Sequence, residues 1–104
     1  MTNIPQLYIG DLPADMLATI TRAGSVAVDG EMMGLNPHRD RLCLLQLATP
    51  DGTACLVNFQ QGNFDAPNLR KLFEDKTVLK LFHFGRLDIA FIKKYLGANV
   101  APVY

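Results

Sequence analysis

The order of β-rich and helical segments limits the possible folds of this 104-residue chain more than any other feature. Three β-rich runs follow one another at residues 25–29, 41–48 and 53–59, and Thr49-Pro50-Asp51-Gly52 predicts a tight turn between the last two. Consecutive strands with short links favour an antiparallel meander. The pattern then alternates: helix 66–75, strand 78–82, helix 86–96 and the beginning of a strand at 100–104. This order predicts an α/β fold with a mixed sheet.

A short strand and a helix are expected before the meander. Residues 7–9 form the strand candidate, which Gly10 closes. Asp11-Leu12-Pro13 then predicts a helix start, with Asp11 as an acidic cap residue near a proline of the first turn. Gly24 predicts the end of this helix.

Composition favours a soluble, cytoplasmic protein. Apolar residues make up 49% of the chain and charged residues 19%, and no apolar run approaches the ~20 residues that a membrane span requires. A turn near residues 50 and 51 would set Cys55 opposite about residue 46, so a disulfide to Cys43 is not expected. Ten basic and ten acidic residues cancel, so the chain has no bulk positive field for nucleic acid.

Two carboxylates leave the first strand of the meander on one side. Because side chains alternate along a strand, Asp29 and Glu31 share one face, with Cα atoms about 7 Å apart. Their oxygens can converge on one hard cation such as Mg²⁺ or Mn²⁺. The alternative is that Asp29-Gly30-Glu31 only leads from the strand into a solvated loop.

Asp88 is a third carboxylate in an unusual setting. Its neighbours on one helical stripe are aromatic or aliphatic: Phe84, Phe91, Ile92 and Tyr95. A carboxylate among such side chains costs several kcal/mol unless it is paired or metal-bound. The alternative is a residue of the first helical turn whose charge favours the helix dipole.

These segments together resemble the DEDD superfamily of 3′→5′ exonucleases. The run Val26 to Leu35 is similar to its first motif, an Asp-x-Glu followed closely by Gly-Leu, and His83 to Asp88 is similar to its second. Asp40 to Leu47 resembles the second strand of the ribonuclease D branch. The resemblance runs from about Tyr8 to Tyr104 and implies a ribonuclease H-like exonuclease fold, as a partial domain over residues 1–104.

The resemblance also implies roles for single residues. Asp29, Glu31 and Asp88 would be the catalytic and metal-binding carboxylates of a two-metal Mg²⁺ or Mn²⁺ site. The residues expected at the substrate are Met32, Met33, Leu35, His83, Phe84 and Arg86. Met33 and Leu35 are alternatively core residues, His83 a structural histidine and Arg86 a surface arginine.

One part of the family pattern is missing. The third motif, a Tyr or His followed four or five residues later by Asp, has no candidate in this sequence. The resemblance therefore implies an incomplete exonuclease acting on single-stranded nucleic acid with a free 3′ end, RNA favoured. The alternative is a non-catalytic domain that binds nucleic acid or a protein partner. An exposed sheet edge at 100–104 suggests self-association.

Overall fold

The computed structural model describes residues 5–34, 41–59, 63–83 and 85–104. Its elements, in chain order, are β1 (Gln6–Ile9), α1 (Ala14–Ala23), β2 (Ser25–Met32), β3 (Leu42–Ala48), β4 (Ala54–Asn58), α2 (Pro67–Glu74), β5 (Leu79–Phe82) and α3 (Arg86–Leu96). Every strand and helix predicted from residues 7 to 96 is present. Gly24 and Gly97 end α1 and α3 in the left-handed conformation, as glycines do at helix ends.

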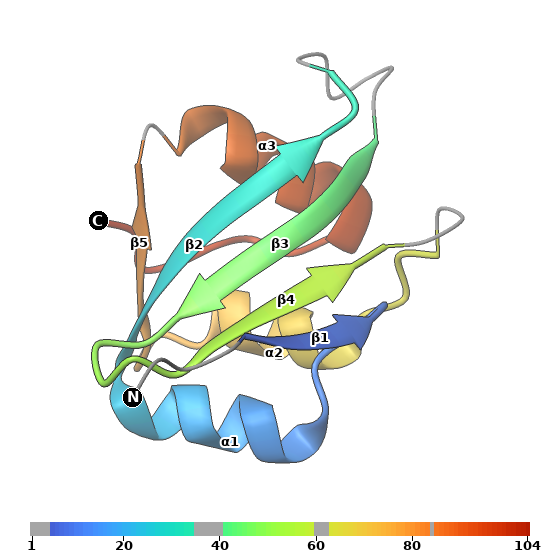
Figure 1. Ribbon diagram of the computed structural model, residues 1–104. Helices are drawn as coiled ribbons and strands as arrows, with labels where there is room; N and C mark the ends of the chain where they lie inside the picture. The colour runs from blue at the N-terminus through green and yellow to red at the C-terminus, as the bar shows by residue number, and fades with distance from the viewer. Residues whose placement is uncertain (1–4, 35–40, 60–62, 84) are drawn as a thin grey trace.

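The strands form one mixed sheet in the order β1-β4-β3-β2-β5 (Figure 1). The pairs β2–β3 and β3–β4 are antiparallel, which confirms the predicted meander. The pairs β1–β4 and β2–β5 are parallel, because a helix intervenes before the chain returns to the sheet. Strand β2 therefore lies inside the sheet, with β3 on one side and the edge strand β5 on the other.

One face of the sheet is buried under the helices. Along β2, Val26 and Val28 are buried whereas Ala27 and Asp29 are exposed, as the period of two requires. In Figure 1, α2 and α3 lie behind the sheet and α1 runs along its lower end. The core fills the space between them and includes Leu45, Val57, Leu72, Phe73, Phe91 and Ile92.

Asp11 caps a different helix from the one predicted. Helix α1 has Pro13 at its N-cap and no side-chain cap bond. Instead, the Asp11 carboxylate accepts the backbone N–H of Asn68 at 3.0 Å and of Leu69 at 2.8 Å, both in the first turn of α2. The loop before α1 is thereby fastened to α2, which sequence spacing could not show because 58 residues separate Asp11 from Leu69.

Lys80 is a fully buried lysine that holds two loops to β5. Its ammonium group donates to the carbonyl of Asp75, and to that of Ala101 at 2.7 Å. Burial lowers the pKa of Lys80, and the nearby charge of Asp75 partly offsets this. The strand expected at 100–104 is reduced to one parallel bridge between Val103 and Lys80.

The two cysteines are unbonded, as predicted. Cys55 lies opposite Leu47, and burial raises the pKa of its thiol to about 11. Within the described ranges, no helix is both long and apolar enough to cross a bilayer.

Asp11→Ala should lower the free energy of unfolding by about 1 kcal/mol, because two N–H groups at the start of α2 lose their acceptor. Urea unfolding of both proteins measures the difference. Asp65→Ala is the control, since it also removes a negative charge near the start of α2 but lies exposed. Equal losses in the two variants would mean that charge near the helix, and not the two hydrogen bonds, carries the effect.

Candidate active site

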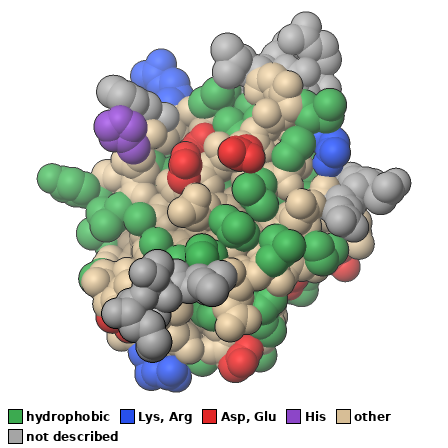
Figure 2. Space-filling model, in the orientation of Figure 1, with side chains coloured by type: hydrophobic (Ala, Val, Ile, Leu, Met, Phe, Trp, Pro, Cys, Tyr) green, Lys and Arg blue, Asp and Glu red, His purple; other side chains and the backbone are tan. Residues whose placement is uncertain are grey.

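Strand β2 presents Asp29 and Glu31 on the face of the sheet that the helices leave open. Asp29 lies opposite Gln46 and Glu31 opposite Leu44, and both acidic residues are exposed. Figure 2 shows carboxylates among hydrophobic side chains on this face. Between Glu31 and Met32 the register shifts, so β2 is irregular where the predicted motif ends. The prediction that Asp29 and Glu31 share one face is confirmed.

Asp88 reaches β2 from the other direction. It lies in the first turn of α3, is only 8% exposed, and its Oδ2 accepts the backbone N–H of Gly30 at 3.3 Å. Strand β5 pairs with β2 only as far as Val28, so beyond that residue β2 can bond to α3 instead. Asp88, the carboxylate of the second motif, is thus hydrogen-bonded to the backbone of Gly30, which lies between Asp29 and Glu31 of the first motif.

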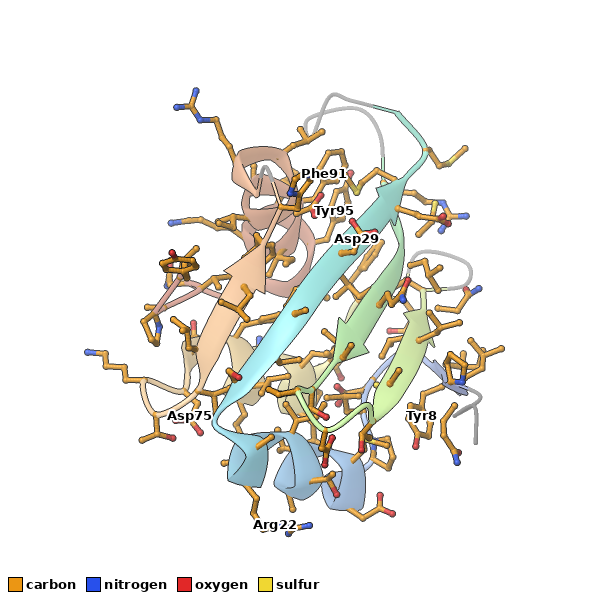
Figure 3. All side chains as sticks on the ribbon, turned by 60° about the vertical axis from the view of Figure 1, so that its left-hand side comes forward. Tyr8, Arg22, Asp29, Asp75, Phe91 and Tyr95 are labelled. Carbon is orange, nitrogen blue, oxygen red and sulfur yellow. The ribbon has the colours of Figure 1, made fainter. Side chains whose placement is uncertain are left out.

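The surroundings of Asp88 are apolar, as predicted. Phe91 and Ile92 are fully buried, and Tyr95 is half-buried with its ring centroid 6.1 Å from that of Phe91. Figure 3 shows Phe91 and Tyr95 on α3. Phe84 lies outside the described residues. Helix α3 has no side-chain cap bond, so Asp88 does not act as a local cap, although its place in the first turn still suits the helix dipole.

Burial and a second carboxylate both act on Asp88. Burial raises the pKa of its carboxyl group, the hydrogen bond from Gly30 lowers it, and the negative charge of Asp29 raises it again, with a net upward direction. Asp29 is therefore close enough for its charge to be felt at Asp88. Two such carboxylates repel each other unless a proton or a cation lies between them.

The three predicted ligands are not grouped as a metal-binding site in this structure. Within the described ranges, no three His, Cys, Asp or Glu side chains are grouped closely enough to hold a metal ion. The physical reason is the strand: Asp29 and Glu31 extend from the open face, whereas Asp88 bonds to the β2 backbone from α3. The structure brings Asp88 to the Asp29–Glu31 strand, but the convergence of all three carboxylates remains a prediction.

The predicted substrate residues lie in different settings. Met32 is half-buried against the core, Met33 is 68% exposed, and Arg86 is exposed at the first position of α3. His83 is exposed directly after β5. Leu35 lies outside the described residues. The core alternative therefore fails for Met33.

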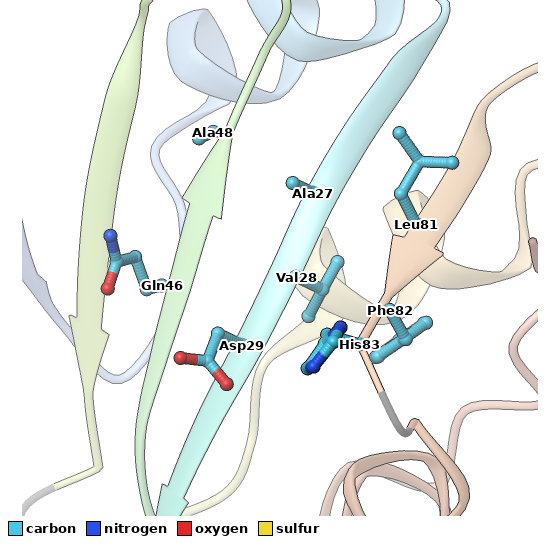
Figure 4. A pocket seen from close by; sticks show the side chains of 8 residues that line it. All are labelled: Ala27, Val28, Asp29, Gln46, Ala48, Leu81, Phe82 and His83. Carbon is cyan, nitrogen blue, oxygen red and sulfur yellow. The ribbon is translucent and has the colours of Figure 1, made fainter.

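An open pocket of ≈ 460 Å³ lies beside Asp29 (Figure 4). Its lining comes from β2, β3, β5 and the residue after β5: Ala27, Val28, Asp29, Gln46, Ala48, Leu81, Phe82 and His83. Sequence reasoning found Asp29 and His83 but missed Gln46, which the strand register alone places opposite Asp29. It also missed the role of the Gly30 N–H, because a backbone amide leaves no signal in the sequence.

Steric crowding does not require a glycine at position 30. A Cβ there would lie 3.6 Å from the Asp88 carboxyl carbon and 3.4 Å from the Met32 sulfur, both ordinary contacts. An alanine at this position would therefore fit the same backbone.

Known proteins share this arrangement of elements. A family model described as 3′-5′ exonuclease matches residues 7–104. Ribonuclease D of Bartonella henselae is 32% identical over 88 residues, which is 85% of this chain and 21% of the relative. Brucella melitensis NrnC superposes with a TM-score of 0.89 at 42% identity, over 100% of this chain and 48% of its own.

A more distant neighbour supports the fold alone. Escherichia coli RNase D superposes with a TM-score of 0.70 at 19% identity and covers 97% of this chain. The chain spans about half the length of the NrnC chain and about a fifth of the Bartonella relative. The family match, the shared fold and the ordered motifs agree: the chain belongs to the ribonuclease D-like 3′-5′ exonucleases of the DEDD superfamily.

Proposed function

We propose that this chain supplies part of the active site of a metal-dependent exonuclease that removes nucleotides from the 3′ end of single-stranded nucleic acid, RNA favoured. The observation that carries the proposal is the bond between Gly30 and Asp88. It joins the two motifs of the family at one place, although they are 58 residues apart. Family membership gives the type of reaction, phosphodiester hydrolysis.

The donor set fits Mg²⁺ or Mn²⁺. Asp29, Glu31 and Asp88 offer only carboxylate oxygens, which these hard cations prefer. Burial and, to a smaller extent, repulsion from Asp29 raise the pKa of Asp88, and a cation would relieve that repulsion. When bound, divalent cations lower the pKa of water and neutralise charge on the scissile phosphate. One Brucella melitensis NrnC structure has bound Mg²⁺, and the EXD2 exonuclease domain was soaked in Mg or Mn.

The residues of the chain have separate roles in this proposal. Asp29 and Glu31 hold cations on the open face, and the Gly30 N–H fixes the orientation of Asp88 beside them. The exposed guanidinium of Arg86, at the start of α3, attracts phosphate, because helix N-termini favour anions. Met32 and Met33 contact the terminal nucleotide, with His83 at its flank; the resemblance also assigns Leu35 and Phe84 to the substrate, and both lie outside the described residues.

A bound relative supports a nucleotide substrate. Brucella melitensis NrnC was captured with pGG, and EXD2 was soaked with GMP. By similarity, short oligonucleotides with a free 3′ end are the first substrates to test. We also propose a cytoplasmic location, in keeping with two free cysteines, and weak self-association through the sheet edge at Val103 and Tyr104, which are 44% and 83% exposed.

Mn²⁺ binding should depend on Asp29. Asp29→Ala should abolish the heat of Mn²⁺ binding in titration calorimetry, because it removes the carboxylate whose charge acts on Asp88. Asp15→Ala on α1 is the matched control, since it removes another exposed carboxylate that is not part of the candidate site. Unchanged heat in Asp29→Ala would remove this residue from the site.

Asp88→Asn should leave the metal-free fold at least as stable as the wild type at pH 7, because Asn can still accept the Gly30 N–H. The folded-state pKa of Asp88 is raised, so its ionisation removes stability as pH rises through that pKa. The advantage of Asn should therefore widen from pH 3 to pH 7, measured by urea unfolding in EDTA. A loss of ~1 kcal/mol or more in Asp88→Asn at pH 7 would show that the charge stabilises the helix.

The chain alone should trim RNA at least ~10²-fold more slowly than a full-length relative, because the general acid–base group of the third motif is missing. A 5′-labelled single-stranded RNA with Mn²⁺ measures this, with Brucella NrnC as the reference and intact mass checked. Trimming at the reference rate, abolished by Asp29→Ala, would show that the third motif is not needed. Mn²⁺-independent RNA binding without any trimming would favour the non-catalytic alternative.

A further inference from the structure

Gln46 is the one exposed residue of β3, a strand that is otherwise apolar. The strand reads Leu42-Cys43-Leu44-Leu45-Gln46-Leu47-Ala48, and its other residues are buried or half-buried. On the open face of the sheet, the neighbours of Gln46 two residues away along the strand are Leu44 and Ala48. A glutamine that only meets solvent would be expected among other polar side chains of its strand, so solvation alone does not explain this one.

Polar residues form one row across three strands at this level of the sheet. Gln46 of β3 lies opposite Asp29 of β2. Val28 pairs with Phe82 in parallel register, so the next residue of the chain after β5, His83, comes beside Asp29. All three side chains are exposed and line the ≈ 460 Å³ pocket (Figure 4). We call Gln46, Asp29 and His83 the polar row.

The adjacent row on the same face is apolar. Ala27 of β2 pairs with Ala48 of β3 and with Leu81 of β5, and these three residues line the same pocket. The side chains on this face therefore change from apolar to polar within two residues on each of the three strands. Because the change falls at Asp29, the polar row belongs to the candidate site and is not a general solvated surface.

Gln46 is within reach of the Asp29 carboxylate. Residues directly opposite each other in an antiparallel pair have Cα atoms about 4.5–5.5 Å apart and side chains on the same face. Figure 4 shows the Asp29 carboxylate extending toward β3, the strand that carries Gln46. Because the Gln46 side chain is exposed, rotation about its side-chain bonds can turn the amide toward Asp29 without displacing the core.

An amide supplies a donor that the carboxylates of the site lack. Ionised Asp29, Glu31 and Asp88 offer only acceptor oxygens, whereas a glutamine amide offers N–H donors and stays neutral. Carboxylates that bind metal are commonly held by hydrogen bonds from neighbouring groups, and the loss of such a partner typically lowers metal affinity ~10–100-fold. A neutral donor can hold Asp29 without the charge repulsion that a lysine or arginine would exert on a cation.

We propose that Gln46 is a positioning residue of the candidate cation site, where its side-chain N–H donates to one oxygen of the Asp29 carboxylate and leaves the other for the cation. This role rests on the proposed function, because it requires that Asp29 binds a cation. It gives Gln46 the same task toward Asp29 that the Gly30 N–H has toward Asp88. A neutral donor from a neighbouring strand then orients each of the two carboxylates.

Gln46→Met should weaken Mn²⁺ binding ~10–100-fold in titration calorimetry, because methionine keeps the length of the side chain but has no N–H donor. Gln6→Met is the matched control, the same substitution at an exposed residue of β1 that lies opposite Cys55 and not opposite a carboxylate. It should bind Mn²⁺ like the wild type. Urea unfolding in EDTA should give Gln46→Met the stability of the wild type, since the side chain is exposed, whereas a merely structural role would lower it.

The side-chain amide gives a second readout, which observes the donor group itself. Titration with diamagnetic Mg²⁺ should shift the NH₂ signals of Gln46 in a nitrogen–proton NMR correlation spectrum, because the amide becomes ordered on Asp29. The NH₂ signals of Gln6 should stay in place. The Gln46 signals are assigned by their absence from the spectrum of Gln46→Met.

Three results would overturn the role of Gln46 alone. They are wild-type Mn²⁺ affinity in Gln46→Met, an equal loss of affinity in Gln6→Met, and Gln46 NH₂ signals that stay unchanged while Mg²⁺ binds. Absence of Mn²⁺ heat from the wild type would instead overturn the proposed cation site and this role with it. If circular dichroism shows that Gln46→Met does not fold, Gln46→Thr takes its place, since threonine suits a strand and is too short to reach Asp29.

Discussion

The candidate site depends on one hydrogen bond, from the Gly30 N–H to the Asp88 carboxylate at 3.3 Å. That length lies just above the usual 2.7–3.2 Å range of N–H···O bonds, so small movements of α3 relative to β2 would break it. The bond is possible because β5 stops pairing with β2 at Val28, which leaves the next part of β2 facing α3. The end of one strand pairing thus creates the place where two distant motifs meet.

The same contact explains why Asp88 is tolerated in an apolar environment. Its helix packs Phe91 and Ile92 into the core, and a carboxylate on that stripe loses solvent. One backbone N–H compensates part of this cost, but the charge of Asp29 adds to it, so the pKa of Asp88 stays raised. A nearby cation would stabilise the ionised carboxylate of Asp88. Functional sites often carry groups whose pKa values are perturbed in this way.

Local patterns predicted most of the fold, because alternation on strands and glycine at helix ends act within a few residues. Residues 86–96, for example, were expected as a helix ending at Gly97, and α3 has these bounds. The strand order β1-β4-β3-β2-β5, the capping of α2 by Asp11 and the position of Gln46 opposite Asp29 depend on long-range pairing. Composition and spacing carry no direct signal for such contacts. The sequence motifs could nominate Asp29, Glu31 and Asp88 but not show that their side chains extend from different directions.

Anomalous diffraction from a crystal soaked in Mn²⁺ tests the central claim most directly, namely that Asp88 completes a cation site with the carboxylates of β2. The account predicts an anomalous peak between the carboxylates of Asp29 and Asp88, at about 2.0–2.2 Å from oxygens of both, as is usual for small hard cations. A peak elsewhere on the molecule, or none near Asp29 at saturating Mn²⁺, would contradict it.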